Sequence, residues 1–170
     1  QTKFDTLIKR VEVLPDNIEK VETYLELSRE YESVDVELAF AYVDKMEALS
    51  KRIKYKKGVR SAIREKGILY YNQREFGSAI LKYKSAFTKK IVSEPADSAD
   101  LFNLLGVAYQ DKGQIDSALL YLNNSLDIYE RIDSDKGRVT IFSNMGNCFY
   151  QVGDEKQALV YAEKAYELTN

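Results

Sequence analysis

One pattern of small and aromatic residues occurs four times along the 170-residue chain. Each copy has a small residue, an aromatic residue three positions later, then an alanine, and a second small residue seven positions after that alanine. The copies are Ser28, Tyr31, Ala41 and Ala48; Gly67, Tyr70, Ala79 and Ala86; Gly106, Tyr109, Ala118 and Ser125; and Gly146, Phe149, Ala158 and Ala165. Their first positions are 39, 39 and 40 residues apart. A fixed period of about 20 to 50 residues indicates a stacked array of repeated units, and such arrays present extended binding surfaces.

The charge balance argues against nucleic acid as the main partner. The chain carries 25 basic and 27 acidic residues, so it lacks the positive excess that provides most non-specific binding to nucleic acid. No run of about 18 apolar residues occurs, and we expect no membrane span in this fragment. The only cysteine, Cys148, has apolar neighbours and is expected to be a small core residue rather than a reactive thiol.

Within each copy, apolar residues recur at helical spacing on both sides of a short break. In the third copy, Leu101 and Leu105 share one helical face, and Ala118 and Leu122 share another after the break. Gly113 lies in the break, and glycine commonly takes a left-handed conformation just after a helix. Each copy therefore predicts two antiparallel helices joined by a tight turn.

The repeated small residues are expected to mark the contact between the two helices of a pair. Two helix backbones approach closely only where the side chains between them are small. Glycine inside a helix costs about 1 kcal/mol relative to alanine, so its recurrence at one position needs such a packing reason. The predicted contact positions are Gly67, Gly106 and Gly146 on the first helices and Ala79, Ala118 and Ala158 on the second helices.

This pattern resembles that of the tetratricopeptide repeat (TPR) family, with a large residue, leucine, glycine and an aromatic residue on the first helix and alanine, a large residue and a small residue on the second. The third copy fills it with Phe102, Leu105, Gly106, Tyr109, Ala118, Leu122 and Ser125, and the fourth with Phe142, Met145, Gly146, Phe149, Ala158, Ala162 and Ala165. The second copy departs from it at Lys66, and the first is weaker. The resemblance implies an all-α, right-handed TPR-type solenoid of antiparallel helix pairs with about nine helices.

We expect this solenoid to be a single TPR domain over residues 1–170. A capping helix is predicted in residues 1–14, where Phe4, Leu7, Ile8 and Val11 form an apolar stripe. The predicted repeats are about 15–57, 58–95, 96–136 and 137–170.

The repeat length differs from the usual TPR length of about 34 residues. Long repeats of 39 or 40 residues, with a Lys-Gly pair before a new helix, resemble the N-terminal regions of exported bacterial TPR proteins, many of them two-component sensor kinases or regulators. The chain also begins with Gln1 rather than methionine, and we expect it to be either a processed product, from which a segment such as a signal peptide has been removed, or an excised piece of a longer chain. The expected location is periplasmic or otherwise extracytoplasmic, and the expected role is a sensory or scaffold region of a larger protein.

Two alternatives remain open at this point. The chain could be a cytoplasmic TPR scaffold or peptide receptor. It could also self-associate through its last helix, where an apolar face is present that a terminal repeat would be expected to have made polar: Leu159, Ala162, Ala165 and Tyr166. That face indicates that more chain or a partner covers it.

The composition argues against an enzyme. The chain contains no histidine, which excludes serine–histidine triads, zinc-protease motifs and cysteine–histidine pairs. No glycine-rich phosphate-binding motif occurs, and the carboxylates are spaced along polar helix faces. We therefore predict a non-catalytic protein- or peptide-binding module with no cofactor and no metal site.

In TPR proteins the first helices line a concave groove, and the register names the residues that would face it. They are Arg64, Ile68, Tyr71 and Asn72; Asn103, Val107, Gln110 and Asp111; and Ser143, Asn147, Tyr150 and Gln151. Ile68 and Val107 stand where TPR domains that clamp a peptide carboxylate have asparagine, which disfavours that ligand. The pattern instead suits an extended peptide, with its backbone bound by Asn103, Asn147 and Gln151 and a side chain against Tyr71 or Tyr150.

A dense basic run is the last feature of the sequence that bears on partners. It comprises Lys51, Arg52, Lys54, Lys56, Lys57, Arg60, Arg64 and Lys66. Such a run could bind an acidic partner, an anionic lipid surface or nucleic acid, but a solvated turn between two helices explains it more simply.

Overall fold

A computed structural model describes residues 3–88 and 94–169 of the chain, and all the regular secondary structure in these residues is helical. The nine helices found there are α1 (Lys3–Val13), α2 (Ile18–Tyr31), α3 (Val36–Arg52), α4 (Lys56–Asn72), α5 (Phe76–Thr88), α6 (Pro95–Asp111), α7 (Ile115–Arg131), α8 (Asp135–Gln151) and α9 (Glu155–Glu167). The all-α prediction and the predicted number of helices are confirmed for the described residues.

The chain divides into two compact units, Gln1–Ile91 and Val92–Asn170. The single domain over residues 1–170, with a repeat boundary at about residues 95 and 96, stays a prediction. The first unit contains α1 to α5 and the second contains α6 to α9.

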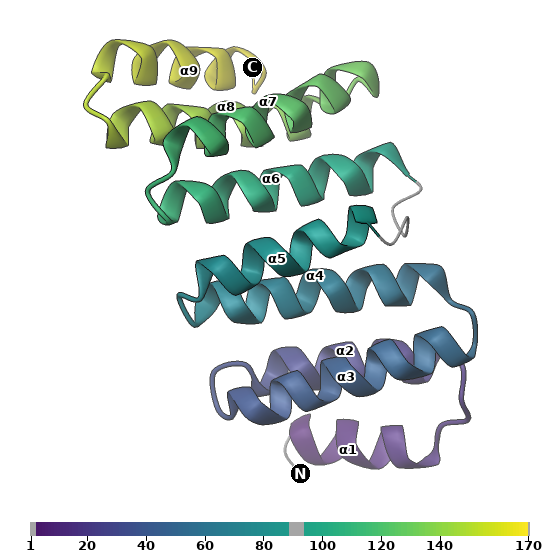
Figure 1. Ribbon diagram of the computed structural model, residues 1–170. Helices are drawn as coiled ribbons and strands as arrows, with labels where there is room; N and C mark the ends of the chain where they lie inside the picture. The colour runs from purple at the N-terminus through teal and green to yellow at the C-terminus, as the bar shows by residue number, and fades with distance from the viewer. Residues whose placement is uncertain (1–2, 89–93, 170) are drawn as a thin grey trace. The chain divides into compact units, whose positions relative to one another are not determined.

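In the first unit, α2 pairs with α3 and α4 pairs with α5, while α1 packs on α2 (Figure 1). Val21, Val43 and Leu69 are buried in the core that α2, α3 and α4 share. A second, smaller cluster forms where Leu7 and Val11 of α1 meet the second helix, which is the packing expected of a capping helix.

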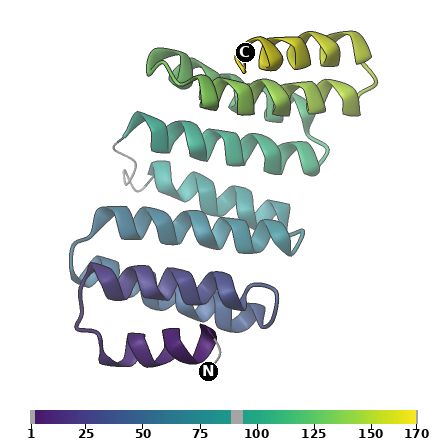
Figure 2. The ribbon, with the colours of Figure 1, turned by 180° about the vertical axis from the view of Figure 1, so that it is seen from behind.

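In the second unit, α6 pairs with α7 and α8 pairs with α9, and α8 also packs against α7 (Figure 2). Leu122 of α7 and Ile141 and Met145 of α8 are buried in one core cluster. Helix α8 therefore packs against α9 within its own pair and also against α7 of the preceding pair, as expected for stacked TPR-type units.

The predicted contact between the helices of a pair is confirmed at Gly106 and Gly67. A Cβ atom added to Gly106 would lie 2.6 Å from Cγ of Leu122, which is too close for two carbon atoms. At Gly67 the added atom would overlap the ring of Tyr83. Leu122 and Tyr83 hold the same position, four residues after the buried alanine of the second helix, and each fills the space that glycine leaves.

The predicted register of the first repeat is wrong on its second helix. Ala41 and Ala48 are exposed, whereas Ala39 and Met46 are buried. The cause is the first turn, in which the Asp35 amide donates to the Tyr31 carbonyl four residues back. In the other pairs the equivalent bond spans five residues, so the first turn is one residue shorter and Ala39 takes the place that we assigned to Ala41.

Two turns between helix pairs hold a non-glycine residue in the left-handed region. Lys54, between α3 and α4, has φ of 58°, and Asp133, at the same place between α7 and α8, has φ of 52°. Aspartate tolerates this conformation better than residues without a short polar side chain. Lys54 is therefore the more strained of the two.

Replacing Lys54 with glycine is expected to raise the free energy of unfolding by about 0.5 kcal/mol. Glycine removes a steric cost of about 1 kcal/mol but adds conformational freedom to the unfolded chain, which offsets part of the gain. Urea denaturation would measure the change. Asp133→Gly is the matched control and should gain less, because Asp133 also lies 3.7 Å from the Arg138 guanidinium. A loss of stability in Lys54→Gly would contradict this account.

The second repeat replaces two apolar positions with lysines that converge on one carboxylate. Lys66 stands where the third repeat has the buried Leu105, and Lys82 stands where it has Tyr121. The Nζ atoms of both lysines lie 3.8 Å from Oε2 of Glu47, and Lys66 also pairs with Asp44. Burial alone would raise the pKa of the Glu47 carboxyl, but a hydrogen bond from Lys51 and the surrounding lysine charges together lower it. The departure at Lys66 is thus a buried ionic cluster.

Glu47→Gln is expected to lower the free energy of unfolding at pH 7 by about 1 kcal/mol, because two largely buried lysines lose their counter-charge. A pKa lowered by folding stabilises the native state above the unfolded value, near 4.5, and this stabilisation disappears as the pH falls through the folded value. The difference between wild type and variant should therefore shrink below about pH 4.5 in urea titrations. As a control, Glu37→Gln on the exposed start of α3 should change the free energy of unfolding at pH 7 by less than about 0.5 kcal/mol.

Candidate binding groove on the last helix pair

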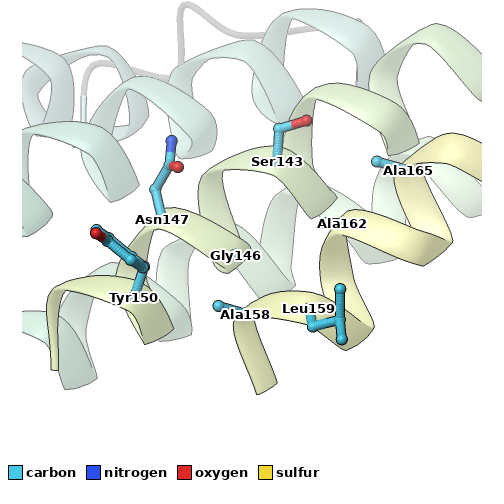
Figure 3. Close-up of a pocket in the computed structure, with 8 residues that line it drawn as sticks. All are labelled: Ser143, Gly146, Asn147, Tyr150, Ala158, Leu159, Ala162 and Ala165. Carbon is cyan, nitrogen blue, oxygen red and sulfur yellow. The ribbon is translucent and has the colours of Figure 1, made fainter. Parts of the chain in front are cut away.

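An open groove of about 510 Å³ runs between α8 and α9 in the second unit (Figure 3). Four residues of α8 and four of α9 line it: Ser143, Gly146, Asn147 and Tyr150, and Ala158, Leu159, Ala162 and Ala165. The buried stripe of α8, represented by Ile141 and Met145, packs toward the third repeat. At helical spacing the groove residues of α8 fall on the opposite side of that helix.

The groove exists because one large residue of the repeat is missing. Ala162 holds the position that Tyr83 and Leu122 hold in the second and third repeats. With alanine there, the space beside Gly146 stays open: an added Cβ on Gly146 would lie 3.4 Å from the Ala158 carbonyl oxygen, an ordinary contact. Ala162 itself is exposed, whereas Leu122 is fully buried. The small residue at position 162 leaves the space beside Gly146 open, and among the described helices none packs over α8 and α9 as α8 packs over α7.

The two walls of the groove differ in chemistry. The α9 wall consists of three alanines and Leu159. The α8 wall adds polar atoms from Ser143, whose hydroxyl donates to the Val139 carbonyl, and from the exposed Asn147. Tyr150 stands at one end with 71% of its surface exposed. The groove can thus enclose apolar groups and bind a few polar atoms along one side.

Apolar side chains continue beyond the groove along α9. Leu159 is 60% exposed, and Tyr166, two helical turns further on, is 69% exposed. In the third repeat the equivalent residues, Leu119 and Leu126, pack against the core cluster and are only partly exposed. The last helix thus presents to solvent a face that is covered in the preceding repeat.

The four predicted groove residues of the second repeat lie on α4 of the first unit. Arg64 and Asn72 are exposed, and the Asn72 amide donates to the Glu32 carboxylate. Ile68 is half-buried. Tyr71 packs against Phe76 of α5, with ring centroids 5.5 Å apart. Ile68, Tyr71 and Asn72 thus already make contacts within the first unit, whereas Arg64 is exposed.

The other eight predicted residues lie on α6 and α8 of the second unit, and the groove brings three of them together: Ser143, Asn147 and Tyr150. Gln151 is exposed but does not line the groove. On α6, the Asn103 side-chain oxygen accepts a hydrogen bond of 2.7 Å from Asn144, Asp111 is exposed, and Val107 and Gln110 are half-buried.

The predicted concave-groove residues do not include the α9 wall, which Ala158, Leu159, Ala162 and Ala165 form, or Gly146. The sequence indicates Leu159, Ala162 and Ala165 as part of an apolar face on the last helix, and Gly146 and Ala158 as a contact between the two helices. It does not join these residues into one groove. The signal that could have found them was the alanine at position 162 where two other repeats have tyrosine and leucine.

The basic run is divided between ion pairs and solvent. Lys51 pairs with Glu47 at 2.6 Å, Arg52 with Asp16, and Lys66 with Asp44. Lys54, Lys56 and Lys57 are exposed around the turn between α3 and α4. Part of the run is therefore structural, and the rest is a charged, solvated turn.

Cys148 is fully buried, and burial raises the pKa of its thiol to about 11. It is thus a core residue, as predicted, because a protonated buried thiol is a poor nucleophile. In the described parts of the chain, no helix is long and apolar enough to cross a membrane. The same residues contain no cluster of acidic, cysteine or histidine side chains suited to a metal ion.

A family model described as tetratricopeptide repeat matches residues 97–170. Residues 97–170 therefore carry tetratricopeptide repeats. The match covers the third and fourth repeats, which include the groove. A comparison with curated protein sequences found no match.

Solved TPR structures share the fold of the chain. A signal transduction ATPase with numerous domains from Pyrococcus horikoshii, which has a tetratricopeptide repeat sensor, is similar over 97% of this chain and 26% of its own, with 19% identity and a TM-score of 0.81. BtubC from P. vanneervenii is similar over 98% of this chain and 70% of its own, with 18% identity and a TM-score of 0.75. MamA from Desulfovibrio magneticus RS-1 is similar over 98% and 83%, with 18% identity and a TM-score of 0.68. At these identities the likeness shows the fold alone.

Proposed function

We propose that the groove between α8 and α9 binds a segment of a partner protein. TPR repeats are generally non-catalytic scaffolds for interactions between proteins, and this fold gives the chain that general role. The observation that carries the proposal is the open hollow beside Gly146 and Ala162, which the preceding repeat fills with its own side chain. A pocket of this size with mostly apolar walls and a few polar groups is typical of binding sites.

The chemistry of the groove assigns roles to its residues. The Asn147 amide can both donate and accept hydrogen bonds at the α8 wall. Tyr150 offers a large, stiff and exposed ring at one end, and such rings lose little side-chain entropy on binding. Leu159 and the alanines of α9 bury apolar groups of the ligand.

A selection from a displayed peptide library on the immobilised chain tests this function. Peptides selected on the wild type are expected to lose binding to the double variant Asn147→Ala with Tyr150→Ala, because the polar contact of Asn147 and the aromatic contact of Tyr150 are removed. Both residues are exposed, so the melting temperature should stay close to that of the wild type.

The control is the double variant Thr140→Ala with Gln157→Ala, which alters exposed residues of the same two helices outside the groove. It should bind the selected peptides as the wild type does. Retained binding by the Asn147→Ala/Tyr150→Ala variant would place the binding site elsewhere.

We further propose that the chain is the extracytoplasmic sensory or scaffold region of a larger bacterial protein, such as a two-component sensor. The long repeats support this role, and the Pyrococcus horikoshii protein of similar fold carries its repeats as a sensor. Protease treatment of intact source cells with a permeabilised outer layer tests it. Digestion of the chain under those conditions supports the proposal, and protection of the chain until the inner membrane is lysed supports a cytoplasmic scaffold or peptide receptor instead.

Self-association through α9 is the second candidate, favoured by the exposed Leu159 and Tyr166. Multi-angle light scattering over a range of concentrations tests it. A mass that rises with concentration in the wild type, and not in Leu159→Asp, supports self-association. A monomer at every concentration removes it.

A further inference from the structure

We propose that the occupant of the groove is a basic amphipathic helix that places one bulky apolar side chain in the hollow above Ala162. This inference rests on the proposed function of the groove and specifies the conformation, the charge and the anchor of the ligand. It replaces the extended peptide that the sequence alone suggested.

The first step is the size of the anchor. In the third repeat the space beside Gly106 holds the leucine side chain of Leu122, and in the second repeat the space beside Gly67 holds the tyrosine ring of Tyr83. The fourth repeat has the same backbone arrangement with only the methyl group of Ala162. The hollow therefore suits one side chain between leucine and tyrosine in size, supplied from outside.

The second step is the conformation of the occupant. An extended segment presents unpaired N–H and C=O groups on every residue, and burying them without partners is costly. The α9 wall offers only alanine and leucine side chains, and the Ser143 hydroxyl already donates to Val139. A helix satisfies its own backbone hydrogen bonds and needs no polar wall.

The repeat itself supplies a template for such a helix. In the third repeat the surface formed by Leu122 and its neighbours is covered by α8, which lays Ile141 and Met145 against it. The surface of α8 and α9 that forms the groove holds the equivalent positions one repeat later. A helix seated there continues the packing that the chain already uses between its third and fourth repeats.

The third step is charge. Residues 92–170 contain thirteen acidic and six basic residues, whereas residues 1–91 contain fourteen acidic and nineteen basic residues. Close to the groove, the exposed Glu155 lies one turn before Leu159 on the same face of α9, while Glu163, which follows Ala162, and Lys156 are exposed at the side of the helix. Lys164 is directed elsewhere, with its Nζ 4.9 Å from the centre of the Tyr161 ring. The rim thus favours a positively charged helix.

Two synthetic peptides with sequences from the chain serve as probes. They correspond to α4 and α8, which each pack against the preceding helix pair in the folded chain. The peptide of residues 56–72 has five basic residues and one acidic residue, and that of residues 135–151 has two basic residues and one acidic residue. Fluorescence anisotropy with the full 170-residue chain should show tighter binding of the 56–72 peptide, weakening as salt is raised. The Ile63→Asp form of this peptide, which breaks its apolar face, should not bind.

The decisive variant is Ala162→Leu, which fills the hollow from within as Leu122 does in the third repeat. It is expected to weaken binding of the 56–72 peptide at least tenfold without lowering the melting temperature. Thr140→Leu adds the same bulk to an exposed site of α8 outside the groove and should bind as the wild type does. Glu155→Lys with Glu163→Lys should remove the preference for the more basic peptide.

Each result decides the inference. Equal binding of the 56–72 peptide by the wild type and Ala162→Leu contradicts the proposal that a side chain of the ligand fills the hollow above Ala162. Ala162→Val provides the same comparison if the leucine variant does not fold. Equal affinity for both peptides at low salt overturns the charge assignment. Absence of binding by both helical peptides, while library peptides still require Asn147 and Tyr150, overturns this inference and leaves the proposed function standing.

Discussion

Leu122→Ala is expected to lower the free energy of unfolding of the second unit by about 3 kcal/mol. Leu122 is fully buried between α6 and α8, where it fills the space beside Gly106 and shares a core cluster with Ile141 and Met145. Removing its side chain costs the transfer free energy of the lost carbons and adds the cost of a cavity that the rigid helix pair cannot close. Urea denaturation followed by circular dichroism would measure the change.

The matched control is Leu120→Ala, two residues earlier on the same helix. Leu120 is 59% exposed, so its loss should change stability by less than about 0.5 kcal/mol. If Leu122→Ala proved as mild as Leu120→Ala, the side chain would not fill the contact beside Gly106. The explanation of the groove as an unfilled copy of that contact would then fail as well.

The helix pairs could be predicted because the sequence repeats. Each of the last three repeats shows glycine, an aromatic residue and alanine at the same intervals, so every copy supports the assignment of the others. The other repeats did not help to assign the second helix of the first repeat, because its turn is one residue shorter. This turn is closed by the hydrogen bond from the Asp35 amide to the Tyr31 carbonyl. Two alanines, Ala39 and Ala41, then competed for one position, and composition alone could not separate them.

The groove could be predicted only on one side. Ser143, Asn147 and Tyr150 were found from the helical register of α8, which depends on local sequence alone. The opposite wall is open because Ala162 lacks the large side chain that Tyr83 and Leu122 provide at the same position of the second and third repeats. Alanine is also the normal residue where two helices touch, so the sequence does not distinguish a tight contact from an empty space. That distinction requires the positions of Gly146 and its neighbours in three dimensions.

The ionic cluster of the second repeat was beyond sequence reasoning for a different reason. Lys66 was recognised as a departure from the repeat, but its partners Glu47 and Asp44 lie on another helix about twenty residues away. Lys82 reaches the same carboxylate from a third helix. A charge at an apolar position indicates that some partner exists, and only the packing of α3, α4 and α5 identifies it.

Gly106→Ala and Gly146→Ala are expected to change stability in opposite directions, although both replace the same glycine of the repeat. Alanine is favoured over glycine inside a helix by about 1 kcal/mol at either site. At Gly106 the new methyl group would lie 2.6 Å from Cγ of Leu122, and such overpacking costs about 1 to 3 kcal/mol, so a net loss of about 1 kcal/mol results. At Gly146 the nearest atom is 3.4 Å away, so the helix preference remains as a gain.

The difference between the two variants, about 2 kcal/mol, is measurable by urea denaturation of the chain. The cause can be tested by combining Gly106→Ala with Leu122→Ala. The alanine at position 106 should be tolerated in that background, because the side chain with which it overlaps has been removed, so the two changes should cost less together than the sum of their separate costs. Strictly additive costs would show that Leu122 does not fill the space beside Gly106. They would also remove the reason for expecting a partner's side chain to fill the equivalent space beside Gly146.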